Sequence, residues 1–200
     1  MFENIRADYA LHNPKRNRAF WHLLIYRYGR WALKLKFTPA RWLLSKIYGI
    51  LNIVVSNFIL DIYMSRDVEV GKGFHIIHPD GVRIHNRAVI GDRVGILHGV
   101  NITQNMFPGH VPVIGNDVFI GAKATIIGKI KVGDGARIAA NTLVITNIPP
   151  GVTAIGVPAK ILRVPASKHP SHRDSTGMPG KFAGEKPSLD RIASEQRTKD

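Results

Sequence analysis

The chain has 200 residues, 44% of them hydrophobic, which is enough for one folded domain with extensions. It contains no cysteine, so disulfides, thiolate metal sites and a cysteine acyl-enzyme are excluded. The formal net charge of +14 favours an anionic partner, which could be nucleic acid, anionic lipid, an acidic polysaccharide or a polyphosphorylated cofactor. No secretory signal pattern opens the chain, so we expect a cytoplasmic protein.

Residues 1–66 are predicted to form a basic α-helical arm. Asn13-Pro14 and Thr38-Pro39 each have the pattern of a helix N-cap followed by proline at the first helical position, which predicts helices over about 14–36 and 39–59. The apolar stretch 43–60 is interrupted by polar residues, which argues against a membrane-spanning helix.

The first of these helices is expected to be amphipathic, because two residue classes recur at three- and four-residue steps. The apolar class is Trp21, Leu24, Tyr28, Trp31 and Leu35, and the basic class is Arg27, Arg30, Lys34 and Arg41. We expect this helix to pack on a neighbouring subunit and to leave its basic face in solvent. The alternative is peripheral association of the arm with the inner face of the membrane.

From Val70 onward an aliphatic residue occupies every sixth position. One register holds Val70, Ile76 and Val82, and the next, after a small insertion, holds Ile90, Ile96 and Ile102. The pattern then continues at Ile114, Ile120, Ile126, Val132, Ile138 and Val144. A strict period of six predicts a three-sided parallel β-helix over residues 67–163, with these side chains inside. Residues 164–200 are polar, have no period and are predicted to be a disordered tail.

The small or branched residues four places after an anchor are expected to fill the neighbouring inward positions. They are Val94, Val100, Val118, Ala124, Ala136 and Thr142. The segment from Gln104 to Val113 interrupts the pattern without shifting its phase, so it is predicted to be a loop inserted between coils.

Residues 70–163 resemble the hexapeptide-repeat acyltransferases. The resemblance rests on Phe-His-Ile-Ile-His78-Pro-Asp-Gly, on Pro-Gly-His110-Val-Pro-Val-Ile-Gly and on Gly-Val-Pro-Ala-Lys160. It is strongest to the serine acetyltransferase branch and to the related exopolysaccharide, colanic acid-type acetyltransferases. It implies a left-handed β-helix, a homotrimer with active sites between subunits and acetyl-coenzyme A as the acyl donor.

The resemblance also implies roles for individual residues. His78 would be the general base that deprotonates the acceptor hydroxyl, since an imidazole suits that task at neutral pH. His110 would bind or polarise the acceptor. The alternative for His78 is a structural histidine at a corner, hydrogen-bonded to the backbone. The alternative for His110 is an exposed loop histidine without a catalytic role. The residues that would line the coenzyme groove are Gly121, Ala122, Ala139, Ala140, Gly156, Val157, Pro158, Ala159 and Lys160.

Three departures from the serine acetyltransferase pattern bear on the acceptor. Ile77 and Gly109 stand where that branch has an aspartate and an arginine that hold the amino acid, and Tyr63 replaces the acidic partner of the catalytic histidine. An unpaired zwitterion would be costly to desolvate, so we expect a sugar hydroxyl of a surface polysaccharide or its precursor. The alternatives are serine O-acetylation and, outside enzymes, a silent β-helix scaffold.

A nucleic-acid binder is disfavoured because no nucleic-acid motif is present. His75, His85 and His98 raise the question of zinc, which gamma-class carbonic anhydrases of similar shape bind through three histidines. The His-x4-His pair of that class is absent, so no metal is expected.

Overall fold

The computed structural model describes residues 2–12 and 18–162. Three helices come first: α1 (Phe2–Leu11), α2 (Ala19–Leu33) and α3 (Thr38–Leu51), the last continuing without a break as a π-helix, η1 (Asn52–Ile59). Fifteen short strands follow within the described residues. The predicted tail, 164–200, and the predicted helix start at Asn13-Pro14 lie outside the described residues.

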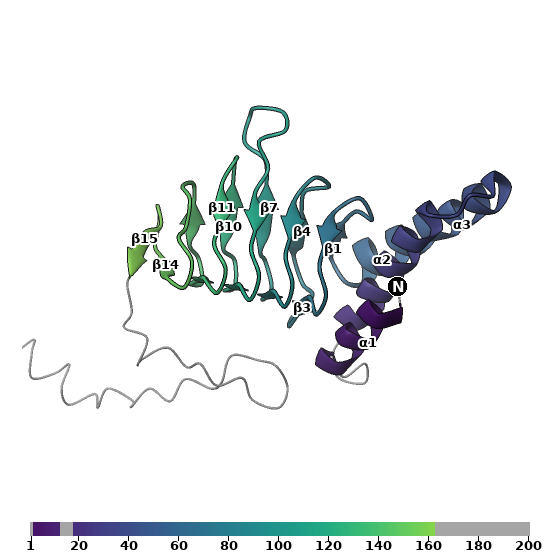
Figure 1. Cartoon of the computed structure of the whole chain (residues 1–200), viewed down its shortest axis with the longest axis horizontal. Helices are drawn as coiled ribbons and strands as arrows, with labels where there is room; N and C mark the ends of the chain where they lie inside the picture. The colour runs from purple at the N-terminus through teal and green to yellow at the C-terminus, as the bar shows by residue number, and fades with distance from the viewer. Residues whose placement is uncertain (1, 13–17, 163–200) are drawn as a thin grey trace, which may run out of the picture. The chain divides into compact units, whose positions relative to one another are not determined.

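The strands form three sheets, and from β1 to β13 each successive strand belongs to the next sheet. Between β13 and β14 the chain contributes only an isolated bridge, from Ile148 to Val132 of sheet B. Sheet A contains β1 (Ile62–Met64), β4 (Val82–Ile84), β7 (Asn101–Thr103), β10 (Thr125–Ile127) and β13 (Leu143–Val144). Sheet B contains β2 (Glu69–Val70), β5 (Val89–Ile90), β8 (Val113–Ile114) and β11 (Lys131–Val132). Sheet C contains β3 (His75–Ile76), β6 (Gly95–Ile96), β9 (Phe119–Ile120), β12 (Arg137–Ile138), β14 (Thr153–Ile155) and β15 (Lys160–Leu162). The chain therefore winds into a β-solenoid of about five turns, which confirms the predicted three-sided β-helix (Figure 1).

The aliphatic anchors stack in three columns inside the solenoid. The columns are Met64, Ile84, Ile102, Ile126 and Val144 in sheet A; Val70, Ile90, Ile114 and Val132 in sheet B; and Ile76, Ile96, Ile120, Ile138 and Ala154 in sheet C. All are buried except the half-buried Val70, and the six predicted secondary positions are buried too. The six-residue period thus corresponds to one anchor side chain per face and per coil, with a second inward position four residues after it.

One register in the sheet A column differs from the prediction. Ile84, not Val82, pairs with Ile102, and Val82 pairs instead with Ile62. The two additional residues therefore fall before Val82, at the corner that contains Pro79 and Asp80, rather than after it. Because Val82 and Ile84 are both buried, the hydrophobic pattern alone could not locate the insertion.

The helical arm also differs from the prediction in its orientation. Arg27, expected on a solvated basic face, is buried, whereas Trp21 and Trp31, expected on the packed face, are 51% and 38% exposed. α3 begins at Thr38 with Phe37 as its N-cap, one residue earlier than predicted, and no side chain caps it. The inward face of α2 is formed instead by Phe20, His22, Leu23, Tyr26, Arg27 and neighbouring small residues.

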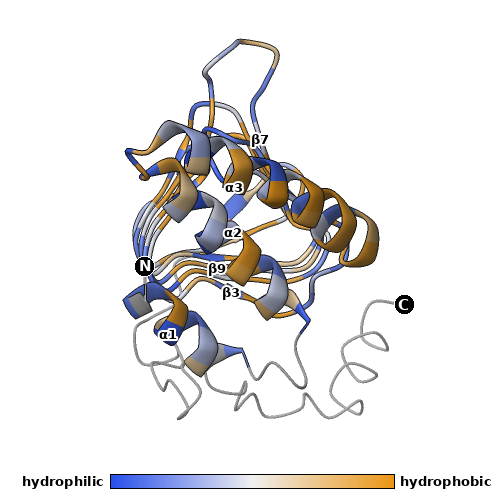
Figure 2. Cartoon of the chain, turned by 90° about the vertical axis from the view of Figure 1, so that its right-hand side faces the viewer, coloured by the Kyte–Doolittle hydropathy of each residue, from blue (hydrophilic) through white to orange (hydrophobic). Residues whose placement is uncertain are grey.

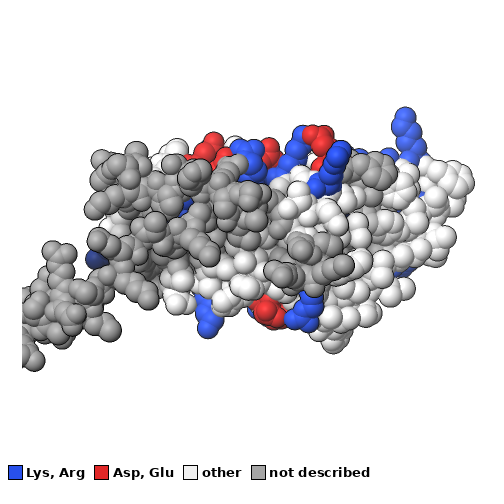
Figure 3. All heavy atoms as spheres, turned by 90° about the horizontal axis from the view of Figure 1, so that it is seen from below, with Lys and Arg blue, Asp and Glu red and all other residues white. Residues whose placement is uncertain are grey.

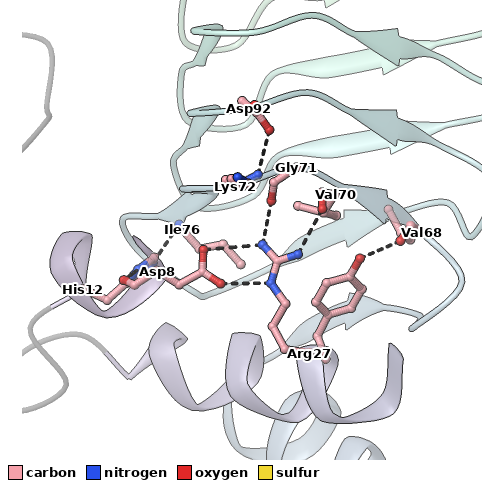
Figure 4. A network of polar contacts seen from close by, with 10 residues as sticks. Asp8, His12, Arg27, Val68, Val70, Gly71, Lys72, Ile76 and Asp92 are labelled. Atoms are coloured by element: carbon pink, nitrogen blue, oxygen red, sulfur yellow. Dashed lines mark hydrogen bonds and ion pairs between the residues drawn. The ribbon is translucent and has the colours of Figure 1, made fainter. Parts of the chain in front are cut away.

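Arg27 is buried because it connects both N-terminal helices to the edge of the first coil (Figure 4). Its Nε lies 3.0 Å from Asp8 Oδ2, and the carboxylate of Asp8 is only 1% exposed. Its Nη1 donates to the carbonyl of Val70 (3.0 Å) and its Nη2 to that of Gly71 (2.6 Å). The guanidinium thus satisfies carbonyls that have no further strand to pair with at this end of the solenoid.

Two other side chains also form hydrogen bonds with backbone groups at the edge of the first coil. The hydroxyl of Tyr26 donates to the carbonyl of Val68 (2.7 Å). His12 Nε2 accepts from the amide of Ile76 (3.1 Å) while its Nδ1 donates to the carbonyl of Asp8 (2.8 Å). This pattern requires a neutral imidazole, in agreement with burial lowering the pKa of His12. α1 and α2 therefore form a polar cap over the first coil.

Candidate active site

The site is built on one corner of the prism, where each coil leaves sheet C and enters sheet A. In the later coils the residue two places beyond each inward anchor of sheet C occupies the same corner position. In the first coil two additional residues lie in this turn and Asp80 takes the backbone position of His98, but the ring of His78 lies beside that of His98 and so belongs to the same corner. The stacked residues, from the first coil to the last, are His78, His98, Ala122, Ala140 and Gly156. We call this set the corner column. Four strand spacings separate its ends, which is roughly 19 Å.

The corner column brings together residues from both predicted groups. His78, the predicted general base, stands at the first coil, and Ala122, Ala140 and Gly156, predicted to line the coenzyme groove, stand on the last three coils. The side chains decrease from two imidazoles to methyl groups and then to none. Along this corner, an extended ligand could lie against the backbone of the later coils and end at an imidazole.

His78 itself is solvent-exposed and lies two residues after the end of β3. Two additional residues widen its turn relative to the coil above. Gly99 donates its amide to the carbonyl of Asp80 (2.8 Å), just as Lys123 donates to the carbonyl of His98 (2.9 Å), so Asp80 rather than His78 pairs with the backbone of the next coil. The ring of His98 lies 6.1 Å from that of His78, measured between centroids. His98 was considered in the sequence only as a metal ligand, and the structure instead makes it the neighbour of His78 in the column.

The predicted coenzyme residues differ in how much they expose. Ala140, Val157, Pro158 and Lys160 are exposed, whereas Gly121 is buried. A Cβ on Gly121 would lie 2.5 Å from the amide nitrogen of Ala140 in the next coil. Close stacking of coils therefore explains this glycine without a ligand.

The last turn of the column folds back on the coil before it. The carbonyl of Gly156 accepts from the amide of Leu143 (3.0 Å), and the amide of Ala159 donates to the carbonyl of Leu143 (2.8 Å). The peptide bond between Val157 and Pro158 is cis. The two hydrogen bonds to Leu143 hold the Gly-Val-Pro-Ala-Lys160 segment at the end of the corner column and place exposed Lys160 at the start of β15.

His110 lies on the inserted loop between β7 and β8, which leaves sheet A at the opposite end of its strands from His78. The loop projects from the coils beside β7 (Figure 1). Within it the amide of His110 donates to the carbonyl of Phe107 (3.2 Å), and the two rings lie 5.4 Å apart. A single chain therefore holds the two predicted catalytic histidines at different corners.

The family resemblance leaves His78 without an acidic partner, and the structure places the carboxylate of Asp61 at the same corner of the prism. Asp61 lies two residues before Tyr63 and beside Gly81, since a Cβ on Gly81 would be 3.7 Å from Asp61 Oδ2. Its Oδ1 is 3.8 Å from Nη2 of Arg83, whose guanidinium stacks 5.0 Å from the centre of the Tyr63 ring. Only the strand register shows that Asp61 belongs to the same corner as His78.

Two other histidines are buried away from this corner. Burial, followed by the charges of His12 and His78, lowers the pKa of His75 to about 4. Burial alone lowers the pKa of His22 to about 3, and neither of its ring nitrogens has a hydrogen-bond partner among the described residues. Across residues 2–12 and 18–162 no three histidine or carboxylate side chains are grouped to hold a metal ion.

Comparison with known proteins gives a consistent picture. Residues 112–146 match the family model described as bacterial transferase hexapeptide (six repeats). Serine acetyltransferase of Salmonella typhimurium is 37% identical over 155 residues, which are 74% of this chain and 56% of that protein. The chain thus spans about half the length of this relative.

Two further matches extend over most of their partners. Serine acetyltransferase of Helicobacter pylori is 37% identical over 142 residues, 70% of this chain and 78% of that protein. The crystal structure of Brucella abortus serine acetyltransferase in complex with coenzyme A superposes with a TM-score of 0.66 at 28% identity, over 80% of this chain and 65% of that one. With the repeats, the corner column and these similarities in agreement, the chain belongs to the serine acetyltransferase family of hexapeptide-repeat transferases.

Proposed function

We propose that the protein is an O-acetyltransferase that takes its acetyl group from acetyl-coenzyme A. The corner column carries this proposal, because it aligns an exposed imidazole with small residues over several coils. The coenzyme A complex of the Brucella abortus relative supports the choice of donor. The coenzyme would run along Ala122, Ala140 and the Gly156 turn, with Lys160 available to a phosphate.

In the reaction, His78 takes the proton of the acceptor hydroxyl as that oxygen attacks the thioester carbonyl. A carbon–oxygen bond forms, the carbon–sulfur bond breaks, and the thiolate of coenzyme A leaves and receives a proton. The absence of cysteine is compatible with this direct transfer, which needs no acyl-enzyme.

The positions of the two histidines favour an oligomer with shared sites. His78 and the loop of His110 lie at opposite ends of the sheet A strands, so one site can use both only if the loop comes from a neighbouring copy. We propose a homotrimer, in which each prism places its loop beside the corner column of the next. The enzyme is proposed to act in the cytoplasm.

L-Serine is the acceptor that the comparisons support better, because the relatives named above are serine acetyltransferases. A neutral sugar hydroxyl remains the second candidate because of the site itself. Ile77 and Gly109 place no charge where the family holds the amino and carboxylate groups of serine. Leaving those groups desolvated and unpaired would cost several kcal/mol, about two orders of magnitude or more in affinity.

Turnover with L-serine and with a panel of sugars and nucleotide sugars tests both the activity and the acceptor. The released coenzyme A can be followed with a thiol reagent, and since the protein has no cysteine it contributes no background. Saturable acetylation of serine would establish the first candidate, and selective acetylation of a sugar the second. Binding of coenzyme A without turnover on any acceptor would favour the silent scaffold.

A further inference from the structure

The helix formed by α3 and η1, residues Thr38–Ile59, has its polar and apolar faces reversed relative to a helix of a water-soluble domain. Its inward face carries Ser45, Tyr48, Asn52 and Ser56, and buried side-chain oxygens of Asn52 and Ser56 have no partner in the described chain. Its outward face is aliphatic and aromatic. The most exposed of these residues are Trp42 (63%), Ile50 (65%) and Phe58 (83%), with Leu43, Ile47, Ile53, Val54 and Ile59 beside them.

The apolar face is continuous and uncharged over most of its length, as the hydropathy colouring of α3 shows (Figure 2). No charged residue occurs from position 47 to position 60. A large contiguous apolar surface is rare on a monomeric soluble protein unless it binds something. In Figure 3, which shows the molecule from below, uncharged residues make up most of the right-hand end.

The charges that flank this face are basic. Lys34 and Lys36 precede the helix, and Arg41 and Lys46 lie in its first half, all exposed. The ammonium of Lys46 is 5.7 Å from the centre of the Trp42 ring. A tryptophan among basic residues at the margin of an apolar face is typical of helices that lie in the interface of an anionic membrane. A second protein copy would have to match the same positive charge with an acidic surface.

The fold decides between spanning and lying on a membrane. Among the described residues, Thr38–Ile59 is the one helix long and apolar enough to span. However, the middle of the helix is bound to the body of the protein, because Arg66 of the first coil donates from its amide to Tyr48 Oη (3.0 Å) and from Nη1 to Ser45 Oγ (3.1 Å). The Tyr28 hydroxyl of α2 also donates to the carbonyl of Leu44 (3.2 Å). A helix held along its side by the soluble body cannot cross a bilayer.

We propose that the outward face of Thr38–Ile59 is a membrane-binding surface that lies in the plane of an anionic lipid bilayer. Its aliphatic and aromatic side chains enter the region between headgroups and acyl chains, and Lys34, Lys36, Arg41 and Lys46 contact lipid phosphates. The surface holds the β-helix beside the bilayer. This proposal does not depend on the identity of the acceptor.

Co-sedimentation of the full-length protein with vesicles tests the proposal. Wild-type protein is expected to bind phosphatidylcholine vesicles containing one quarter phosphatidylglycerol, and to bind pure phosphatidylcholine at least tenfold more weakly. Ile50→Asp with Phe58→Asp should lower binding at least tenfold. Ile145→Asp, on a half-exposed aliphatic residue of the β-helix, is the matched control and should leave binding unchanged.

A second measurement keeps the test valid if the double variant fails to fold. Brominated lipid should quench tryptophan fluorescence of the wild type, and the conservative Trp42→Phe should lose at least half of that quenching. Unchanged quenching in Trp42→Phe, or failure of the wild type to bind anionic vesicles, would overturn the proposal. So would a double variant that keeps vesicle binding but changes oligomeric mass by light scattering, because the face would then be a contact between copies.

Discussion

Replacing Arg27 by methionine should show how much the polar cap contributes to stability. The substitution keeps most of the side-chain length but removes the guanidinium from Asp8 and from the carbonyls of Val70 and Gly71. Burial already raises the pKa of Asp8 against the opposing effect of Arg27. Without Arg27 the pKa of Asp8 should rise further, because the guanidinium that opposes the effect of burial is removed.

The expected loss is about 3–5 kcal/mol of unfolding free energy, the usual cost of removing one partner from a buried ion pair. Combining Arg27→Met with Asp8→Leu should recover about 2 kcal/mol of this loss, because the remaining partner is removed as well. Recovery is incomplete, since the two carbonyls still lack a donor. Urea unfolding followed by circular dichroism, at one fixed protein concentration, measures all three variants.

The exposed pair of Arg93 and Asp117 provides the matched control. Its closest nitrogen and oxygen are 2.6 Å apart, but the Arg93 side chain is half exposed. Arg93→Met should cost less than about 1 kcal/mol, as surface ion pairs do. If Arg27→Met costs no more than Arg93→Met, the cap does not stabilise the first coil and our account of its role is wrong.

Three further predictions concern the site and its surroundings. His78→Ala should lower turnover roughly 10²–10⁴-fold and leave the dissociation constant of coenzyme A nearly unchanged, because a general base acts on the transferred proton and not on the bound donor. His110→Ala should lower turnover and also raise the KM of the acceptor. Full activity of His78→Ala in a thiol-release assay would exclude the mechanism. Lys160→Ala should weaken coenzyme A binding about fivefold at low salt in calorimetry, and Lys131→Ala, on sheet B, should not; equal effects would mean only general charge attraction. The free energy of unfolding should fall as the pH drops below 6.5, because His22 stays neutral in the folded protein but takes up a proton in the unfolded chain. Between pH 6.5 and 5 this difference lowers the free energy of unfolding by up to about 2 kcal/mol, and His22→Leu should abolish that part of the pH dependence.

The β-helix could be predicted in detail because its period is a property of neighbouring residues. One inward aliphatic residue per face recurs at six, and Ile114 to Val144 keep that spacing without a gap. The exception at Val82 has a physical reason. Val82 and Ile84 are both apolar and both buried, so the position of a two-residue insertion is set by pairing with Ile102, which no local pattern reveals.

The helical arm was harder to predict because its periodicity does not say which face is inward. Arg27 and the aromatic residues of α2 each recur at helical steps, and burial of Arg27 depends on Asp8, nineteen positions away. Basic residues are normally exposed, so a single sequence favours the wrong face. The apolar stretch of α3 was recognised in the sequence, but its composition does not show that its apolar side chains face outward.

The site lay between these two cases. His78 and the small residues were predicted individually from the family pattern, but their alignment along one corner appears only when the strand register is known. Asp61 could not be predicted, because the family pattern places the acidic residue at the position of Tyr63. Its place beside Gly81 follows from the pairing of Ile62 with Val82.

The helical cap covers the first end of the solenoid, and at the last end β15 closes sheet C by running antiparallel to β14. Growth from either end is therefore blocked, but the middle coils repeat with a constant step. An eighteen-residue copy of one coil, inserted between Ile114 and Val132, would lengthen the prism by one strand spacing, about 4.8 Å, and leave both closures in place. The distance from His78 to the Gly156 turn would therefore change by one strand spacing for each coil added or removed. Variants with more or fewer coils could accommodate a longer or shorter ligand.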